Sequence, residues 1–148
     1  MSRDLYIVDD NADYQFLMYK LIKDSAMPYS VKFFESGQAL YRHIQVLLQN
    51  KQPEYLPALI LLDLNMSGMN GLGLLKRFRQ ASQLNDVQIR EIPVVIMSSD
   101  ISAHQIKQCY QAGANAVVIK PFDFNHMKNT VQSICRFWMT ESTDVKIG

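Results

Sequence analysis

Three acidic residues come directly after, or at the end of, short apolar runs. Asp9 and Asp10 follow residues 5–8, and Asp63 ends residues 58–63. Carboxylates that converge on one small pocket repel one another and raise each other's pKa unless a cation is present. Hard divalent cations prefer oxygen ligands, and Mg²⁺ takes one or two carboxylates while keeping several waters. We therefore predict that Asp10 and Asp63 bind Mg²⁺ (or Mn²⁺), and that Asp9 holds a water or orients the cluster.

A serine and a lysine follow two later apolar runs. Ser98 comes after residues 94–97, and Lys120 comes after residues 116–119. Transfer of a phosphoryl group depends mostly on positioning and on electrostatic stabilisation. Lys120 can neutralise the charge of such a group, and Ser98 can donate a hydrogen bond to one of its equatorial oxygens. The carboxylate of Asp63 is then the predicted nucleophile.

Each of these residues also has an ordinary structural interpretation. An acidic pair after a strand often caps a helix, a single serine is commonly a turn residue, and a single lysine is usually a solvated surface charge. Asp63 could cap the helix expected to start near residue 70 or 71, although the separation is too large for a direct cap. The functional hypothesis therefore rests on the ordered set at successive strand ends.

The segments that carry these residues predict an α/β fold. Five β-type runs alternate with five helical patterns; the runs lie at residues 5–8, 29–34, 58–63, 94–97 and 116–119. A short apolar run without alternation suits a central strand of a parallel sheet, and the alternation of strands with helices predicts a doubly wound parallel sheet. Ligands of such sheets bind outside the carboxyl ends of the strands, where the polar residues fall. The second run ends near Phe34 and Glu35 without such a residue, which is expected of an edge strand.

Composition sets the class of protein. The chain has 148 residues, 48% of them hydrophobic, which suits one domain with a proper core. The net charge of +1 gives no case for nucleic acid. No apolar stretch approaches the roughly 20 residues of a membrane span, so we expect no membrane association. Two cysteines without metal-type spacing indicate a reducing compartment, and the cytoplasm is the expected location.

The motifs together resemble the receiver domain of two-component response regulators over nearly the whole chain. The segments are YIVDD, LLDLNMSGMNG, PVVIMSSD and AGA…VVIKPF. The resemblance implies a flavodoxin-like (βα)5 receiver fold with strand order 2-1-3-4-5, occupying residues 1–140 and followed by a polar tail at 141–148. It also implies that Asp63 accepts a phosphoryl group from the phosphohistidine of a sensor histidine kinase.

The resemblance assigns roles to further positions. The metal ligands are Asp10, Asp63 and the backbone carbonyl of Asn65, and Asp9 assists them through a water. Ser98 and Lys120 bind the phosphoryl oxygens. A cis peptide bond joins Lys120 to Pro121, in keeping with the small energetic preference of X–Pro bonds for trans.

The sequence departs from the usual pattern of that family at three positions. Ser67 stands where proline is usual, and Ser98 replaces the commoner threonine. Val117 aligns with the aromatic residue whose side chain normally swings during activation. A valine cannot make that large rotameric change, so we expect output through displacement of loops and helices.

The chain ends with its last helix, so we expect a stand-alone receiver. The long polar connections at 49–57 and 82–91, together with Phe137 and Trp138, are similar to those of small response regulators paired with bacterial phytochromes. A phytochrome-type kinase is therefore the expected partner. Part of the aromatic pair could support a homodimer through the surface of the last two helices and the last strand; ordinary core packing is the alternative.

Other functions remain open at this point. A phosphorelay intermediate would use the same residues. Haloacid-dehalogenase-type phosphatases also use a nucleophilic Asp, but they place a second acid where this chain has Asn65, so we expect no enzyme activity beyond self-phosphorylation and dephosphorylation. An unphosphorylated interaction module would bury the charged pocket at a cost in stability. A flavodoxin-like cofactor binder would need a phosphate loop where this chain is acidic after its first strand.

Overall fold

The strands form one parallel five-stranded sheet. The computed structural model describes residues 4–66, 71–80 and 87–139. The strands are β1 (Asp4–Val8), β2 (Ser30–Phe34), β3 (Leu59–Asp63), β4 (Val94–Ser98) and β5 (Ala116–Ile119). Their order in the sheet is β2-β1-β3-β4-β5, and every neighbouring pair is parallel. The expected doubly wound sheet with order 2-1-3-4-5 is confirmed, with β2 at an edge.

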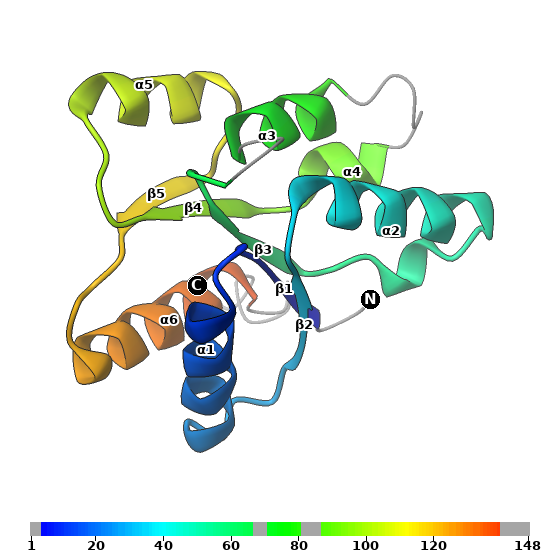
Figure 1. The fold of residues 1–148 in the computed structure, drawn as a ribbon. Coiled ribbons are helices and arrows are strands. Elements are labelled where there is room, and N and C mark those ends of the chain that lie inside the picture. The colour runs from blue at the N-terminus through cyan, green and yellow to red at the C-terminus, as the bar shows by residue number, and fades with distance from the viewer. Residues whose placement is uncertain (1–3, 67–70, 81–86, 140–148) are drawn as a thin grey trace, which may run out of the picture.

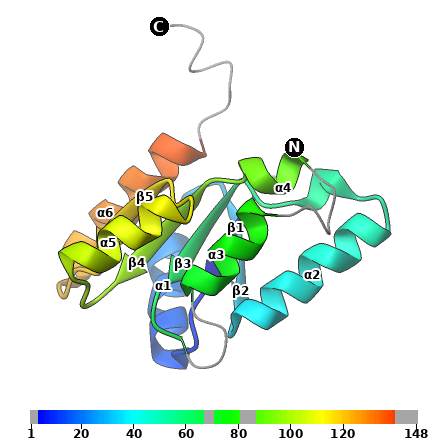
Figure 2. The same cartoon turned by 90° about the horizontal axis from the view of Figure 1, so that it is seen from above.

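Helices cover both faces of this sheet (Figure 1). The helices are α1 (Ala12–Asp24), α2 (Gly37–Gln49), the 3₁₀ turn η1 (Pro53–Tyr55), α3 (Gly71–Arg79), α4 (Val87–Glu91), α5 (Ala103–Gln111) and α6 (Phe124–Trp138). Helices α1 and α6 lie on one face, and α2, α3, α4 and α5 lie on the other. Seen from above, α3 lies between α2 and α5 (Figure 2). Among the described residues, no helix combines the length and the apolar character needed to cross a membrane.

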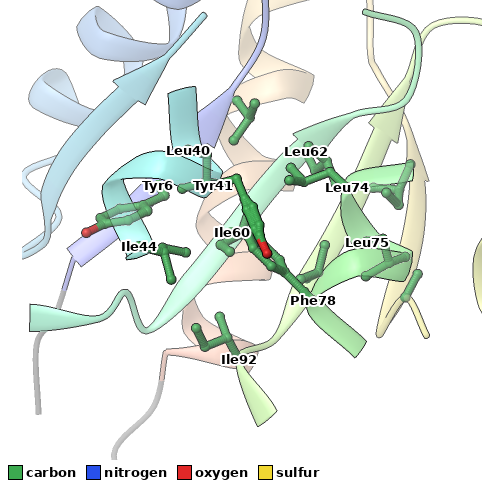
Figure 3. Packing of buried hydrophobic residues seen from close by; sticks show 14 of the residues in the cluster. Tyr6, Leu40, Tyr41, Ile44, Ile60, Leu62, Leu74, Leu75, Phe78 and Ile92 are labelled. Carbon is green, nitrogen blue, oxygen red and sulfur yellow. The ribbon is translucent and has the colours of Figure 1, made fainter. Parts of the chain in front are cut away.

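Two apolar cores hold these layers together, one on each face of the sheet. Figure 3 shows the first, in which Tyr6 and Ile60 of the sheet meet Leu40 and Ile44 of α2 and Phe78 of α3. The second core packs the α1 and α6 residues against the alternate side chains of the same strands. A central strand buried on both faces carries the unbroken apolar run that the sequence shows at 58–63.

Part of the connection expected to be polar, at residues 82–91, forms the short helix α4 instead. The side chain of Ile89 is completely buried in the first core, and Ile92 is nearly so. Two apolar residues are too few to produce a helical period in the sequence, yet burying them against the sheet stabilises this turn of helix. The expectation of five helices is therefore wrong for the described chain, which has this additional one.

The register of the strands aligns their carboxyl ends. Val8 of β1 pairs with Leu62 of β3, so the acids that follow Val8 lie beside Asp63 at the end of β3. Asp63 pairs with Met97, the residue before Ser98. The backbone N–H of Lys120 donates to the carbonyl of Ser98 at 2.8 Å, which brings the end of β5 to the same edge.

Aromatic residues 137 and 138 at the end of α6 have different surroundings. Phe137 is 73% exposed, whereas Trp138 packs on the second core. The rings form an edge-to-face pair with centroids 4.8 Å apart. Core packing thus accounts for Trp138, and Phe137 is the member that lies on the surface.

Candidate functional site

Three carboxylates meet at the carboxyl edge of the sheet. Asp9, Asp10 and Asp63 each offer one oxygen, and these oxygens all lie within 4.8 Å of one another. Asp9 is almost completely buried, Asp63 is partly buried and Asp10 is exposed. An all-oxygen donor set that is open to water on one side fits a divalent cation that keeps some of its waters. The structure brings together the three acids that the sequence placed in one pocket.

Asp9 is the most constrained of the three acids. The N–H of Asn11 donates to one of its carboxylate oxygens at 2.9 Å, and the ammonium of Lys120 lies 2.9 Å from the other. Its backbone is also held, because Nε2 of Gln15 donates to its carbonyl at 2.6 Å and its own N–H donates to the carbonyl of Phe34 at 3.0 Å. With both oxygens occupied by direct contacts, Asp9 is suited to orienting the site.

Lys120 lies between two of these acids. Its Nζ lies 2.9 Å from Oδ2 of Asp9 and 3.5 Å from Oδ1 of Asp63. The same nitrogen is 4.0 Å from the centroid of the Tyr14 ring. A lysine in this position partly neutralises the carboxylates, and it is within reach of any group bonded to Asp63.

Opposing influences act on the pKa of Asp63. Burial raises the pKa of this carboxyl above its ordinary value, and the charge of Asp9 raises it further. The nearby ammonium of Lys120 and a hydrogen bond from the backbone N–H of Asn65 act in the opposite direction, but burial is the largest effect. The nearby positive charge therefore does not fully offset the cost of burying the ionised Asp63 carboxylate, and a bound metal ion would stabilise this ionised form.

Ser98 is completely buried, and its hydroxyl is already used. Nδ2 of Asn65 donates to Oγ of Ser98 at 3.3 Å, and that hydroxyl donates to the backbone carbonyl of Asp100 at 3.1 Å. These bonds tie the loop after β3 to the loop after β4. To donate to a phosphoryl oxygen, the hydroxyl has to give up the Asp100 carbonyl.

Gly71 permits the close approach of α3 to the end of β3. A Cβ at this position would lie 2.5 Å from the backbone oxygen of Asp63. The N–H of Gly71 also donates to the carbonyl of Leu64 at 3.1 Å. Since backbone atoms cannot swing aside, a residue with a side chain would push α3 or Asp63 out of place. The departure at Ser67 falls outside the described residues.

Val117, at the position of the usual aromatic residue, packs on the first core. Its backbone N–H donates to the hydroxyl of Tyr110 at 3.3 Å. Tyr110 belongs to α5 and is half exposed. The hydroxyl of a tyrosine on the neighbouring helix thus contacts the backbone of this strand at Val117.

The peptide bond between Lys120 and Pro121 is trans, as are all peptide bonds of the described chain. The expectation of a cis bond is therefore wrong for this structure. Trans is the lower-energy isomer of an X–Pro bond by about 0.5–1 kcal/mol, so trans needs no compensating contact. Here Lys120 reaches both acids with the bond in that form.

Sequence reasoning missed Tyr14, Gln15 and Gly71 as parts of this site. Tyr14 has the helical spacing of the other apolar residues of α1, which by itself indicates packing only. Its position five residues after Asp9, on the helix that follows the acidic pair, is a signal that could have found it. Gln15 is one residue further along, and its bond to the Asp9 backbone depends on a side-chain rotamer that no pattern reveals.

Comparison with known proteins identifies the family. Residues 5–132 match the response regulator receiver domain. The chain belongs to the response regulator receiver family. Proteins of this family act as phosphoacceptors in two-component signalling. The cluster of three acids described above is consistent with that role.

Relatives of this receiver chain come from archaea, plants and bacteria. It is 24% identical to "Probable methanogenesis regulatory protein FilR2" of Methanothrix harundinacea (strain 6Ac), covering 91% of this chain and 83% of that protein. It is 33% identical to the two-component response regulator ORR3 of Oryza sativa subsp. indica, covering 77% and 76%. A match to the sensory/regulatory protein RpfC of Xanthomonas campestris pv. campestris (strain 8004) is 45% identical over 60% of this chain but only 12% of that protein.

Solved structures share the receiver fold. The response regulator RPA3017 in red light signaling of R. palustris superposes with a TM-score of 0.80 at 23% identity, covering 93% of this chain and 94% of that one. The Mn²⁺-bound form of response regulator Rcp1 gives 0.71 at 23% identity, covering 93% and 94%. The bacteriophytochrome response regulator AtBRR gives 0.69 at 25% identity, covering 96% and 99%.

Proposed function

We propose that Asp63 accepts a phosphoryl group from a sensor histidine kinase in a reaction that needs a divalent cation. The observation that carries the proposal is the convergence of Asp9, Asp10 and Asp63 within 4.8 Å, with Lys120 only 3.5 Å from Asp63. A carboxylate oxygen of Asp63 attacks the phosphorus, and the bond from phosphorus to the histidine nitrogen of the kinase breaks. The ammonium of Lys120 balances charge on the phosphoryl oxygens.

Asp10, Asp63 and the backbone carbonyl of Asn65 are the proposed ligands of Mg²⁺ or Mn²⁺, and Asp9 contributes through a water. When bound, the cation supplies positive charge to the phosphoryl oxygens. Two features support this assignment: the donors are all oxygen atoms, and burial leaves the Asp63 carboxylate short of positive charge. The Asp9 side chain, already bonded to Asn11 and Lys120, has the least freedom to coordinate a metal directly.

The test is incubation with acetyl phosphate, with Mg²⁺ or with EDTA, followed by intact-mass measurement. We expect a gain of one phosphoryl group only with the metal, and no gain in Asp63→Asn. Asp24→Asn is the matched control, because Asp24 is an exposed acid at the end of α1. A wild-type chain that gains no mass and binds no beryllofluoride would contradict the proposal and favour an interaction module that is never phosphorylated.

Signalling then proceeds by a shift between two conformations. We propose that Ser98 and the start of α5 move toward the phosphoryl group. The present bonds of the Ser98 hydroxyl to Asn65 and Asp100 support this, since donation to a phosphoryl oxygen requires release of the Asp100 carbonyl. With Val117 in place of an aromatic residue, output runs through displacement of loops and helices. Identical amide shifts of α5 and α6 with and without beryllofluoride would contradict this route.

The proposed partner is a phytochrome-type histidine kinase, in the cytoplasm. The similarity to a bacteriophytochrome response regulator over 96% of this chain supports it. The test compares the initial rate of phosphotransfer from an autophosphorylated phytochrome kinase with that from an unrelated histidine kinase. Faster transfer from the phytochrome kinase is expected. Onward transfer from Asp63 to the histidine of another protein would instead make the chain a phosphorelay intermediate.

A second copy of the chain is the proposed partner for the face of α5, β5 and α6. Each of these elements exposes a large apolar side chain: Tyr110, Ile119 and Phe137 are between 50% and 73% exposed. Sedimentation of the wild type and of Ile119→Glu with Phe137→Glu tests the idea. Loss of a dimer in the double variant is expected. A wild type that is monomeric with and without beryllofluoride would contradict it.

A further inference from the structure

The aromatic ring beside the site's lysine has no role in the reaction as proposed so far. We propose that Tyr14 is a positioning residue that holds the ammonium of Lys120 where it meets the phosphoryl group on Asp63; this inference rests on the proposed function of Asp63. The contact that carries it is the 4.0 Å distance between Nζ of Lys120 and the centroid of the Tyr14 ring. A cation within about 6 Å of an aromatic face is attracted by the ring quadrupole, most strongly where water is excluded.

The ring is fixed by three elements of the fold. The N–H of Tyr14 donates to the side chain of Asn11, the N-cap of α1, at 3.0 Å. Its hydroxyl lies 3.9 Å from the sulfur of Met97 on β4 and 3.9 Å from that of Met127 on α6. Thioethers are weak acceptors, so the hydroxyl has no strong partner in these contacts. The face of the ring, rather than its hydroxyl, is the part that contacts the charged site.

The ring remains neutral beside the lysine. Burial raises the pKa of Tyr14 well above its ordinary value, and the charges of Asp9 and Asp63 raise it further. The contact with Lys120 is therefore between a cation and a neutral aromatic face. It adds to the two carboxylate contacts without adding charge to a cluster that already contains three acids.

Such a contact suits a lysine that must change partners. Lys120 has a flexible four-carbon stem, and ordering it costs rotamer entropy. When Asp63 becomes an acyl phosphate, the ammonium has to shift from the carboxylate oxygen to a phosphoryl oxygen. A hydrogen bond is directional, whereas an aromatic face attracts a cation over a range of positions. The Tyr14 ring can therefore attract the Lys120 ammonium both before and after this shift.

The simpler interpretation is that the Tyr14 ring only fills space between α1 and the sheet. Substitutions that keep the shape and change the electrostatics separate the two roles. Tyr14→Phe keeps the ring, and pentafluorophenylalanine introduced at position 14 by amber suppression keeps the shape but reverses the quadrupole. Tyr14→Leu removes the ring. Tyr19→Leu is the matched control, since Tyr19 is an exposed tyrosine on the same helix with Lys23 6.0 Å from its ring.

The experiment measures, in the full chain with Mg²⁺, the rate of phosphorylation by acetyl phosphate and the proton shifts of the Lys120 ε-methylene group. We expect Tyr14→Phe and Tyr19→Leu to react at the wild-type rate within about twofold. We expect Tyr14→Leu and the pentafluoro variant to react about tenfold more slowly, the size of a partly desolvated cation–π contact. Ring current should shift the ε-methylene protons upfield in wild type and Tyr14→Phe, but not in Tyr14→Leu.

The failures are distinguishable. Equal rates for Tyr14→Phe and the pentafluoro variant would overturn the role of Tyr14 while leaving phosphorylation at Asp63 intact. A wild type that is not phosphorylated would overturn the proposed function and this role with it. Because the pentafluoro ring fills the same space, the comparison with Tyr14→Phe decides the matter even where Tyr14→Leu does not fold.

Discussion

The ammonium nitrogen of Lys120 lies 2.9 Å from Oδ2 of Asp9, and this ion pair joins the end of β5 to the end of β1. The side chain of Asp9 is only 2% exposed, and it contacts this ammonium directly. Oδ1 of Asp63 lies 3.5 Å from the same nitrogen. The same lysine thus contacts the buried acid Asp9 and lies within reach of Asp63, where phosphorylation is proposed.

Lys120→Met should destabilise the fold by about 3 kcal/mol at neutral pH, because it leaves a buried carboxylate without its cation. Thermal or urea unfolding measures this change. Adding Mg²⁺ should recover part of the loss, since the ion supplies positive charge to the same acids. Lys107→Met, at an exposed position on α5, is the control and should change stability by less than about 0.5 kcal/mol. Similar losses of stability in both variants would show that the ion pair of Lys120 with Asp9 does not stabilise the fold.

Asp63→Asn should be more stable than wild type at neutral pH in the absence of metal. Burial, the largest influence, raises the pKa of Asp63 from 3.8. The folded chain therefore binds this proton more tightly than the unfolded chain does. Stability falls as pH rises from the ordinary value through the raised one, and the full cost is present above it. The advantage of the asparagine should thus disappear as the pH is lowered to about 4.

Urea unfolding of both proteins at a series of pH values measures this difference. Asp24→Asn is the control, because it removes one acidic charge at an exposed position at the end of α1. Mg²⁺ should reverse the order at neutral pH by stabilising wild type more than Asp63→Asn. An asparagine variant that is less stable at every pH without metal would contradict the expected sign.

Gly71→Ala should lower both stability and the rate of phosphorylation. The added methyl group would lie 2.5 Å from the backbone oxygen of Asp63, so α3 or the end of β3 has to move. Overpacking of this kind costs about 1–3 kcal/mol, and here the displaced atoms belong to Asp63, the proposed phosphoacceptor. Unfolding gives the first quantity and intact-mass kinetics the second. Unchanged phosphorylation in a folded variant would mean that the shift is taken up entirely by α3.

Arg79→Met should destabilise the chain by about 3 kcal/mol, because it removes a guanidinium that bonds to four oxygens at once. These are the backbone carbonyls of Gly113, Arg90 and Ile92 and the side chain of Asn115, at 2.8–3.0 Å. Burial lowers the pKa of Arg79, and the loss of several partners around a buried group is costly.

The matched control for Arg79 is Lys76→Met on the exposed side of the same helix, which should change stability by less than about 0.5 kcal/mol. The two variants remove the same charge from α3. Equal urea midpoints would therefore show that the bonds of Arg79 add nothing beyond its charge.

The sequence by itself determined the architecture and the main residues of the site. Short apolar runs alternate with helical patterns, and each run that ends in Asp63 or is followed by Asp9, Ser98 or Lys120 forms a strand of the parallel sheet. Parallel strands in register end at one edge, so polar residues that follow them have to meet there. The apolar runs were sufficient to predict the strands, because a strand buried on both faces has to be apolar at every position.

Tertiary structure alone decided the details that depend on distant contacts. The helix at Val87–Glu91 exists because Ile89 finds a place in the core, the Lys120–Pro121 bond is trans, and Ser98 is bonded to Asn65 and Asp100. By its spacing Tyr14 is one more packing residue of α1, but in the folded chain its ring lies beside Lys120, 106 positions further along the chain. A linear pattern reports which side chains are buried, but a rotamer and its partner are set only when separate elements pack together.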